Sequence, residues 1–389
     1  MSASFPVTAY SLCNALGMTT STVVGALRRG ASGLRPCALP LPFDAVCGAL
    51  PEALPALPHA LQAFDTRQAR LLQAVIQGLE GPLQAARQRW GADRIGVALG
   101  TSTAGIAQTE LAYESFKRLG RPPENYQFVH QHPPDAMLRF LAATHGFAGP
   151  AVVVSTACSS SVKVFGVARR WLELDLCDAV LIGGIDTLCQ LTLRGFKSLD
   201  LLSAQPCQPF SASRAGLNLG EGGALLLLER EGNGPARLLG VGETSDAYHM
   251  TAPHPDGIGA IAAMGDALQQ AGLAADQVDH INAHGTGSQL NDAVEGLAIA
   301  QLFGDHVPVS ATKGYTGHLL GAAGATEAAF AVASIEHGFI PASLGSAPQD
   351  PTLGIQISHH PVDRPVHVVL SNSFAFGGNN VSVVFAGGK

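Results

Sequence analysis

Short runs of valine, isoleucine, leucine and alanine recur along this chain, and longer segments with helical spacing separate them. Short apolar runs bounded by turn residues are typical of strands that are buried on both faces of a sheet. We expect strands at Arg94–Leu99, Ala151–Val154, Ala179–Ile182, Ala224–Leu228, His280–Ala283, Val307–Ser310, His367–Leu370 and Val381–Phe385. Ser160–Leu174 and Gly321–His337 have the length and periodicity of buried helices. This alternation predicts an α/β fold.

Two strand-to-turn junctions occur twice in the chain. Ala98-Leu-Gly-Thr-Ser is similar to Ala283-His-Gly-Thr-Gly, and Val154-Ser-Thr-Ala-Cys is similar to Val309-Ser-Ala-Thr-Lys. We therefore expect two related halves, 1–231 and 232–389, which meet near the charged turn at 229–235. The first half carries about thirty extra residues between its two junctions, around Glu110–Pro150, and this insertion predicts a cap or a dimer arm.

The composition excludes several classes of function. Of the 389 residues, 47% are hydrophobic and only 14% are charged, so the chain must bury much of its surface. The net charge of −7 provides no basic field for a nucleic acid. No apolar run approaches the roughly 18 residues of a membrane span, and no basic leader precedes one, so we expect a soluble, cytoplasmic protein. The seven cysteines lack C-x-x-C pairing and are expected to be reduced thiols.

Cys158 is the cysteine best placed for chemistry. It follows the expected strand Ala151–Val154 and precedes Ser159-Ser-Ser, which is a good capping run for the next helix. A thiol at a helix N-terminus faces unpaired N–H groups and a positive dipole, which lower its pKa and favour a nucleophile. A buried packing role is the alternative for this residue, as it is for the other cysteines.

The second half places polar side chains at its own strand ends, namely His284, Lys313 and His318. Ligands and catalytic groups gather at the carboxyl ends of strands in α/β folds, so these residues are expected to face Cys158 across one cavity. A zinc site from Cys158 and the two histidines is disfavoured because no C-x-x-C pair is present, and His280 and His284 lie roughly 13 Å apart on a strand.

A Cys/His/Asn hydrolase with Asn372 or Asn379 is a further alternative, but it leaves one histidine idle. Near the C-terminus, Asn372-Ser-Phe-Ala-Phe-Gly-Gly-Asn-Asn follows a strand. Its glycines allow the backbone to approach a reacting group, and Phe374 and Phe376 supply apolar walls. The segment is therefore interpreted as an active-site loop, with a plain glycine-rich turn as the alternative.

Four motifs in order resemble the elongating β-ketoacyl-acyl-carrier-protein synthases of the thiolase superfamily. They are Thr156-Ala-Cys-Ser-Ser, Ala283-His-Gly-Thr-Gly, Thr312-Lys-Gly-Tyr-Thr-Gly-His-Leu-Leu-Gly-Ala-Ala-Gly and Asn372-Ser-Phe-Ala-Phe-Gly-Gly-Asn. Ser245-Asp-Ala-Tyr-His-Met-Thr also resembles the family, so the similarity spans essentially the whole chain. It implies the five-layered αβαβα thiolase-like fold with two pseudo-symmetric halves.

The resemblance implies a decarboxylative condensation of an acyl thioester with malonyl-acyl-carrier protein, in fatty-acid or polyene and polyketide biosynthesis. Cys158 is similar to the nucleophile, and His284 and His318 are similar to the pair that acts on the malonyl group. Lys313 would be oriented by Glu327, and the N–H groups of Cys158 and Phe376 would form the oxyanion hole. Phe376 is also similar to the gate between the two substrates, and the implied substrate-binding residues are Thr286, Ser288, Asp246, Thr251, Phe374, Phe196 and Thr103.

Three positions depart from the family pattern. Ala375 stands where the gate loop usually has glycine, and Thr103 stands where a bulkier residue usually limits the acyl pocket, so we expect Thr103 at the floor of that pocket. Where the family commonly contacts the carrier protein through a basic residue, this chain has Lys197, and the acidic Asp200 follows three residues later. Arg67 and Arg70 are therefore the alternative candidates for carrier docking.

The resemblance implies no cofactor, because the substrates are carried on the phosphopantetheine of an acyl carrier protein. It also implies a homodimer whose contact includes Gln127–Met137, or a heterodimer with a second ketosynthase-like chain. Two alternatives use the same scaffold. A chain-length-factor-type partner subunit normally lacks the nucleophile, whereas Cys158 is present; a thiolase or acyltransferase normally has a second cysteine near the C-terminus, and none follows Cys207.

Overall fold

The computed structural model describes residues 3–388, and its main sheet contains two sets of five strands with the same order and sense. In the first set the order is β5-β4-β6-β8-β1, where β4 is parallel to β5 and β6, and the other pairs are antiparallel. In the second set the order is β11-β10-β15-β16-β9, with the same pattern of parallel and antiparallel pairs. The predicted repeat is therefore confirmed at the level of topology.

The strands of the first set are β1 (Phe5–Asn14), β4 (Ile95–Gly100), β5 (Ala151–Val154), β6 (Ala179–Asp186) and β8 (Gly222–Glu229). Those of the second set are β9 (Ala236–Ser245), β10 (His280–Asn282), β11 (Pro308–Ser310), β15 (Val368–Ala375) and β16 (Asn379–Gly387). Pairing of Phe5–Val7 with Ala236–Leu238 joins the sets, and β13 (Gln356–Ile357) completes an eleven-stranded sheet. Short strands elsewhere are β2 (Arg35–Pro36), β3 (Val46–Gly48), β7 (Leu219–Gly220), β12 (Phe339–Ile340) and β14 (Val362–Asp363).

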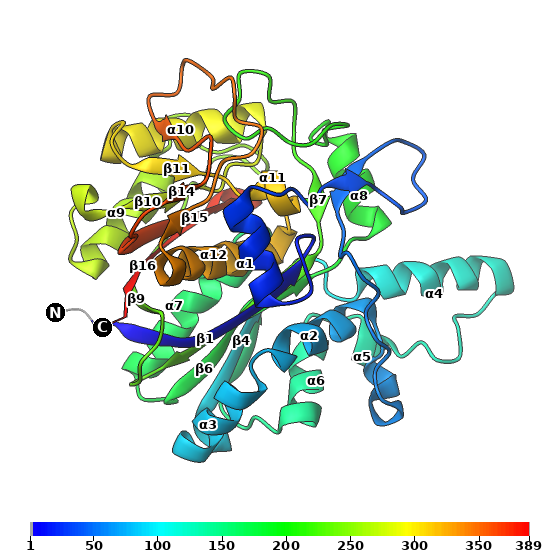
Figure 1. The fold of residues 1–389 in the computed structure, drawn as a ribbon. Coiled ribbons are helices and arrows are strands. Elements are labelled where there is room, and N and C mark those ends of the chain that lie inside the picture. The colour runs from blue at the N-terminus through cyan, green and yellow to red at the C-terminus, as the bar shows by residue number, and fades with distance from the viewer. Residues whose placement is uncertain (1–2, 389) are drawn as a thin grey trace.

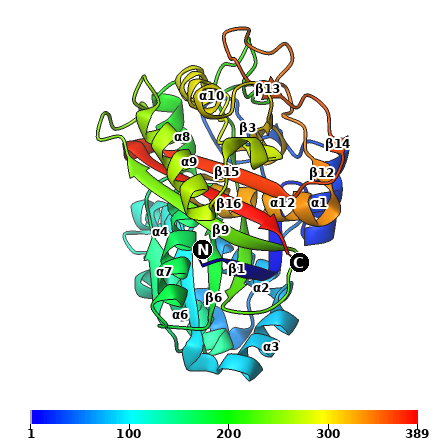
Figure 2. The ribbon, with the colours of Figure 1, turned by 90° about the vertical axis from the view of Figure 1, so that its left-hand side faces the viewer.

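Helices form three layers around and between the two sets of strands (Figures 1 and 2). The central layer holds α7 (Ser160–Glu173) and α12 (Ala323–His337), which pack against strands of both sets. One outer layer contains α2 (Arg67–Gln77), α3 (Glu80–Trp90) and α6 (Ala136–His145), and the other contains α9 (Ile258–Ala271) and α10 (Gln289–Phe303). The five-layered αβαβα thiolase-like architecture is confirmed.

The central layer depends on small residues. Every residue of α12 from Ala323 to Ser334 is buried. A Cβ at Gly324 would lie 2.7 Å from the Val162 Cβ of α7, so this close approach requires glycine. The alanine-rich sequence therefore lets α7 and α12 pack in contact between the two sets of strands.

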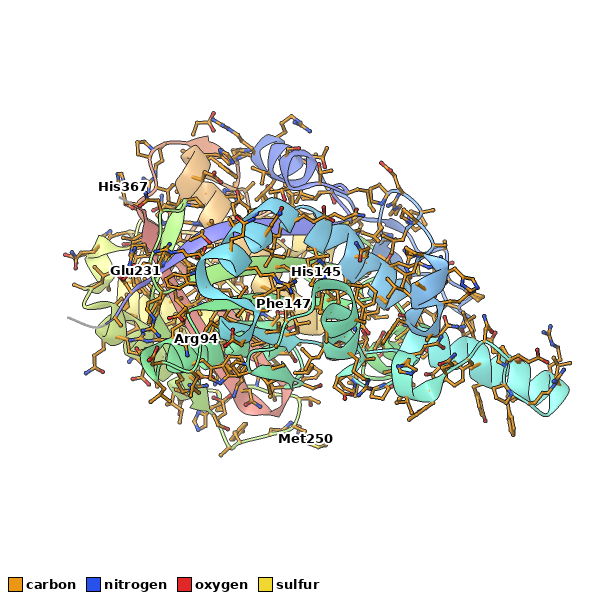
Figure 3. The ribbon with its side chains drawn as sticks, turned by 90° about the horizontal axis from the view of Figure 1, so that it is seen from below. Arg94, His145, Phe147, Glu231, Met250 and His367 are labelled. Atoms are coloured by element: carbon orange, nitrogen blue, oxygen red, sulfur yellow. The ribbon has the colours of Figure 1, made fainter. Side chains whose placement is uncertain are left out.

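The extra residues of the first half lie between β4 and β5, as expected. They form α4 (Ile106–Leu119), α5 (Phe128–Gln131) and α6, and α4 extends away from the body of the molecule (Figures 1 and 3). The arm exposes large apolar side chains, including Leu111, Tyr113, Phe116, Leu119, Phe128 and Val129. In contrast, His145 at the end of α6 stacks on Phe147, with 5.6 Å between the ring centroids.

All the expected strands and both expected helices are present, with ends that differ by a few residues. The sequence reasoning missed β1, because polar residues such as Thr8 interrupt its apolar run. It expected an apolar strand after the 229–235 turn without giving its bounds, and β9 lies there. The division at 231/232 stays a prediction; its nearest landmark is the connection between β8 and β9. Within residues 3–388, no helix has the length and apolar character needed to cross a membrane, and all seven cysteines are free.

The remaining helices surround the site or connect strands. They are α1 (Thr20–Arg29), α8 (Gln190–Ser198) and α11 (Lys313–Thr316), with 3-10 turns η1 (His59–Phe64), η2 (Ala92–Arg94), η3 (Ala275–Gln277), η4 (Leu320–Ala322) and η5 (Phe376–Gly378). Thr19 and Thr22 form a capping box at the start of α1.

Candidate active site

Cys158 lies between β5 and α7, one residue before the N-cap Ser159. The thiol is buried, with 6% of the residue exposed. The serine run does not cap the helix as expected, because the Ser159 side chain makes no capping hydrogen bond. Its hydroxyl instead donates to the Thr156 carbonyl at 2.9 Å, and the Ser160 hydroxyl donates to the Ala157 carbonyl at 2.6 Å. These bonds hold the turn that presents Cys158.

The two histidines of the second half converge on this thiol. His318, just before η4, places Nε2 2.9 Å from Cys158 Sγ, and its ring centroid is 5.3 Å from that of His284, which follows β10. Ligand-type atoms of all three side chains lie within 4.8 Å of one another. The predicted convergence across the two halves is confirmed.

Lys313 and Glu327 form a buried ion pair behind His284. Lys313 Nζ lies 2.6 Å from Glu327 Oε1 and 3.3 Å from His284 Nδ1, and it also donates to the His284 carbonyl. Because an ammonium group can only donate, His284 Nδ1 must accept this bond, which leaves the ring proton on Nε2. The same positive charge makes the triad an unfavourable site for a divalent cation.

The electrostatics correct one expectation. Burial raises the pKa of Cys158 to about 11, although the Lys313 charge and the backbone N–H groups of Phe376 and Cys158 oppose that rise. The predicted lowering of this pKa is therefore wrong: removal of the thiolate from water outweighs the help from its neighbours. Burial, followed by the Lys313 charge, holds the pKa of both histidines well below its ordinary value, so both imidazoles are neutral at pH 7.

A cavity of about 540 Å³ leads from the surface to these residues. Its walls include most of the residues expected to bind substrate, namely Phe196, Asp246, Thr251, Thr286, Ser288, Phe374 and Phe376, together with the catalytic candidates Cys158, His284 and His318. The Thr286 and Ser288 hydroxyls lie 2.9 Å apart, and the Phe196 and Phe376 rings stack at 5.8 Å. Lys313 and Glu327 are not among its walls because they lie behind His284.

Thr103 does not line this cavity. Its side chain is fully buried, and its hydroxyl donates to Asp186 Oδ1 at 2.6 Å. The expectation that Thr103 forms the floor is wrong for this cavity, because the carboxylate of Asp186 holds the hydroxyl inside the protein. A role for Thr103 in limiting the acyl chain stays a prediction.

The gate loop obtains its turn from the residues after Ala375. Ala375 has an ordinary extended conformation, with φ −110°, whereas Gly377 and Gly378 have φ values of 80° and 73°. Glycine is therefore needed two and three residues after Ala375 rather than at it. The Gly377 N–H donates to the Met250 carbonyl at 2.8 Å, and Met250 itself is exposed on the loop after β9 (Figure 3).

The candidate docking arginines already have acidic partners. Arg67 contacts the buried Glu221 through two nitrogens, and Arg70 contacts Asp65 at 2.5 and 2.6 Å. The proposal that these arginines offer free charge to a carrier protein is therefore not supported. Lys197 lies 5.9 Å from the ring of Phe43, and Asp200 lines the mouth of the cavity.

Two acidic residues that position the site were missed. Glu295 in α10 accepts hydrogen bonds from the His284 and Gly285 N–H groups, both at 2.7 Å. Asn372 donates to the same carboxylate at 3.2 Å. Its side chain is therefore bonded to Glu295 and not to a histidine, as the asparagine of a Cys/His/Asn hydrolase would be. Asp186, at the end of β6, is the second; an acidic residue two positions after the glycine pair near the end of the strand was the signal for it.

Comparison with known proteins agrees with this geometry. Residues 49–233 match the family described as beta-ketoacyl synthase, N-terminal domain, and residues 235–347 match beta-ketoacyl synthase, C-terminal domain. The 3-oxoacyl-[acyl-carrier-protein] synthase 2 of Staphylococcus aureus is 34% identical over 311 residues, which cover 76% of this chain and 77% of that protein. Nodulation protein E of Rhizobium meliloti is 35% identical over 304 residues, 75% of each chain.

Among solved structures, a chain of the complex between the ketosynthase ApeO and its chain length factor ApeC from Xenorhabdus doucetiae superposes with a TM-score of 0.92. The match has 38% sequence identity and covers 99% of this chain and 98% of the other. Fold, ordered motifs and the Cys158, His284 and His318 geometry all agree. This chain belongs to the β-ketoacyl synthase family of acyltransferases.

Proposed function

We propose that this protein condenses an acyl group, held as a thioester on Cys158, with a malonyl unit carried by an acyl carrier protein. The contact of 2.9 Å between His318 Nε2 and Cys158 Sγ is the observation that carries this proposal, because it brings groups from both halves to one reacting centre. Neither half has this set of groups alone.

The first step is acyl transfer to Cys158. The C–S bond to Cys158 forms as the C–S bond to the carrier thiol breaks, and the proton of the Cys158 thiol passes to the departing carrier thiolate. His318 Nε2 lies 2.9 Å from Sγ, and as an N–H donor it would stabilise the attacking thiolate. The N–H groups of Cys158 and Phe376 already face Sγ and would stabilise the oxyanion.

The second step needs both imidazoles. Loss of CO₂ from the malonyl thioester places negative charge on the thioester oxygen, and N–H donors from His284 and His318 would stabilise that enolate. Its carbon then attacks the acyl carbonyl on Cys158, which releases the Cys158 thiolate. Lys313 keeps His284 neutral and accepts no proton from it, so the ring proton stays on Nε2. The lowered pKa of His284 therefore keeps the imidazole in the form that donates Nε2–H to the enolate.

The cavity fits a phosphopantetheine arm. It is open at Asp200 and Leu290 and ends at Cys158, and its inner wall carries the Thr286 and Ser288 hydroxyls, which can bond the amides of the arm. Asp246 and Thr251 lie near its entrance beside the gate loop, consistent with a role in admitting the arm.

We place the reaction in a polyene or polyketide pathway and the protein in a dimer with a second ketosynthase-like chain. The similarity to the complex of a ketosynthase with its chain length factor, at 38% identity over 99% of this chain, supports this assignment. The presence of Cys158 favours the catalytic subunit over the chain-length-factor-type subunit.

Two features of the chain support the dimer. Strand β5, Ala151–Val154, is an uncovered edge of the main sheet and carries only apolar residues, which a monomer would normally avoid. The arm around α4 and α5 exposes the apolar side chains described above. The contact at 127–137 inferred from the family is part of this arm and stays a prediction.

Mass spectrometry tests the proposed function. The intact protein is incubated with a panel of acyl-carrier thioesters, and acyl additions are mapped to individual cysteines. We expect addition at Cys158 and, after malonyl-carrier protein is added, release of a product longer by two carbons. Acylation elsewhere, or acylation without condensation, would contradict the proposal and favour an acyltransferase on the same scaffold.

A further inference from the structure

Asp186 is a fully buried carboxylate that the proposed reaction does not use. It lies at the end of β6 and accepts hydrogen bonds from the loop after β4. Oδ1 accepts from the Thr101 hydroxyl at 2.5 Å and from the Thr103 hydroxyl and N–H at 2.6 and 2.9 Å. Oδ2 accepts from the Ser102 hydroxyl and from the Ala322 N–H, both at 3.1 Å. One carboxylate thus joins β6, the loop after β4 and η4.

The segments joined by Asp186 carry strained backbone. Ala104, Ala157 and Leu320 have φ values of 44°, 52° and 53°, a region that residues with a Cβ rarely adopt. Ala157 directly precedes Cys158, and Leu320 lies two residues after His318. Such conformations persist only where the surrounding contacts fix them. The hydrogen bonds to Thr103, next to Ala104, and to Ala322, two residues after Leu320, provide contacts of that kind.

Close packing carries this constraint to the nucleophile. A Cβ at Gly100 would lie 2.3 Å from the Ser161 nitrogen, so the end of β4, directly before the loop that Asp186 holds, touches the first turn of α7. The Gly321 N–H donates to the Ser102 hydroxyl at 2.9 Å, and the Ala325 N–H donates to the Ser161 hydroxyl at 2.9 Å. The turn with Cys158 and the turn with His318 are therefore both packed against the loop that Asp186 holds.

We propose that Asp186 is a positioning residue that fixes the distance between Cys158 and His318 by clamping the loop after β4 to η4. It contacts neither thiol nor imidazole and acts through the backbone of both halves. Its effect on condensation rests on the proposed function, whereas the clamp itself rests only on the hydrogen bonds and close packing described above. The proposal also explains why Thr103 points to the interior: its hydroxyl is one of the groups that Asp186 holds.

Asp186→Asn is the variant that tests the clamp with the least change of shape. An amide presents one acceptor, so it can satisfy Thr101 and Thr103 with its oxygen. Its NH₂ group would then face the Ser102 and Ala322 N–H groups, where donor meets donor. We expect η4 to move away, and His318 with it. Glu229→Gln is the matched control, because Glu229 is a buried carboxylate bonded to Thr8 and Trp90, away from the cavity.

The first measurement is the rate of Cys158 alkylation by iodoacetamide between pH 6 and 10, followed by peptide mass spectrometry. Burial is the largest cause of the raised Cys158 pKa, and it is kept in this variant because the walls of the cavity are retained. The backbone N–H groups of Phe376 and Cys158, which oppose the rise, act only when they are aligned with Sγ, so displacement of the turn weakens them. We expect Asp186→Asn to shift the profile to higher pH, with alkylation at pH 8 about tenfold slower, which corresponds to about one pH unit. Glu229→Gln should keep the wild-type profile even if its melting temperature falls.

The second measurement is steady-state condensation. A positioning defect should lower kcat about tenfold or more while the KM for malonyl-carrier protein changes less than about twofold, because the walls of the cavity are retained. If Asp186→Asn does not fold, the same measurements are made on Ser102→Ala, which removes the hydroxyl that links Asp186 to Gly321. We expect a smaller shift in the same direction, with alkylation about threefold slower.

An alkylation profile of Asp186→Asn that coincides with wild type, or one displaced to lower pH, overturns the proposal. The same holds for Ser102→Ala if it is the variant that folds. Alkylation needs no acyl or malonyl substrate. A wild-type protein that fails to condense would therefore contradict the proposed function and still leave the comparison of profiles valid.

Discussion

The two halves of this molecule have the same strand order but contribute different chemistry to the cavity. After β5 the first half places Cys158, and after β11 the second half places Lys313 at the equivalent position of the repeated junction. Near the end of β4 the first half has the apolar Leu99, whereas the equivalent position of the second half, after β10, has His284. The first half thus supplies the covalent attachment point, and the second supplies the charge and the N–H donors.

This difference shows how one duplicated scaffold can divide two reaction steps. The Cys158 turn is buried among apolar groups, which raises the pKa of the thiol, and the Lys313 turn provides a positive charge that opposes the rise. Each half is therefore incomplete without the other. The predictions below test that division.

Cys158→Ser should have the largest effect. A serine hydroxyl is far less ionised than a thiol and has no dedicated base here, so condensation should fall at least about 10³-fold. The change is nearly isosteric, and the melting temperature should be close to that of wild type. Elongation at the wild-type rate would show that Cys158 is not the nucleophile.

His284→Ala and His318→Ala test the second half. Each should lower malonyl decarboxylation by about 10²–10³-fold, the usual cost of losing a donor to a developing oxyanion. Cys158 should keep some ability to accept an acyl group, since backbone N–H groups assist that step. The two half-reactions are assayed separately. Equal loss of both steps in each variant would mean that the histidines serve mainly to activate the thiol.

Substitutions at Thr103 separate its possible roles in the first half. Thr103→Phe adds volume at a fully buried position, and we expect it to lower the ratio of long to short acyl primers elongated by ~5–100-fold. Thr103→Val keeps the shape but removes the hydroxyl that bonds Asp186, so the ratio should stay as in wild type while kcat falls. An unchanged ratio in Thr103→Phe would place Thr103 outside the acyl pocket.

The pH dependence of Cys158 alkylation gives the smallest effect. Thiolate is the reactive form, and the pKa of Cys158 is raised, so the rate should increase about tenfold per pH unit from pH 7 toward 10. Lys313→Met combined with Glu327→Gln removes the positive charge without leaving a buried carboxylate unpaired. We expect alkylation about three- to tenfold slower at each pH. A plateau near pH 7 in wild type would contradict the raised pKa.

The sequence alone determined the fold class and the identity of the reacting groups. Apolar runs with turn residues at their ends predict buried strands because continuous burial leaves no room for polar alternation, and the repeated junctions predict two halves. Cys158, His284, Lys313 and His318 stand out because each is a chemically active residue in the turn or loop that follows such a run. These signals lie within short stretches of sequence, so they can be recognised without a structure.

Only the tertiary structure decided what depends on groups distant in the chain. The pKa of Cys158 rises rather than falls, because burial by both halves outweighs the local effect of the helix N-terminus. Thr103 turns to Asp186, which is 83 residues away, and Arg67 turns to Glu221, which is 154 residues away. Desolvation and long-range hydrogen bonding are properties of the packed fold, and no local pattern in the sequence encodes them.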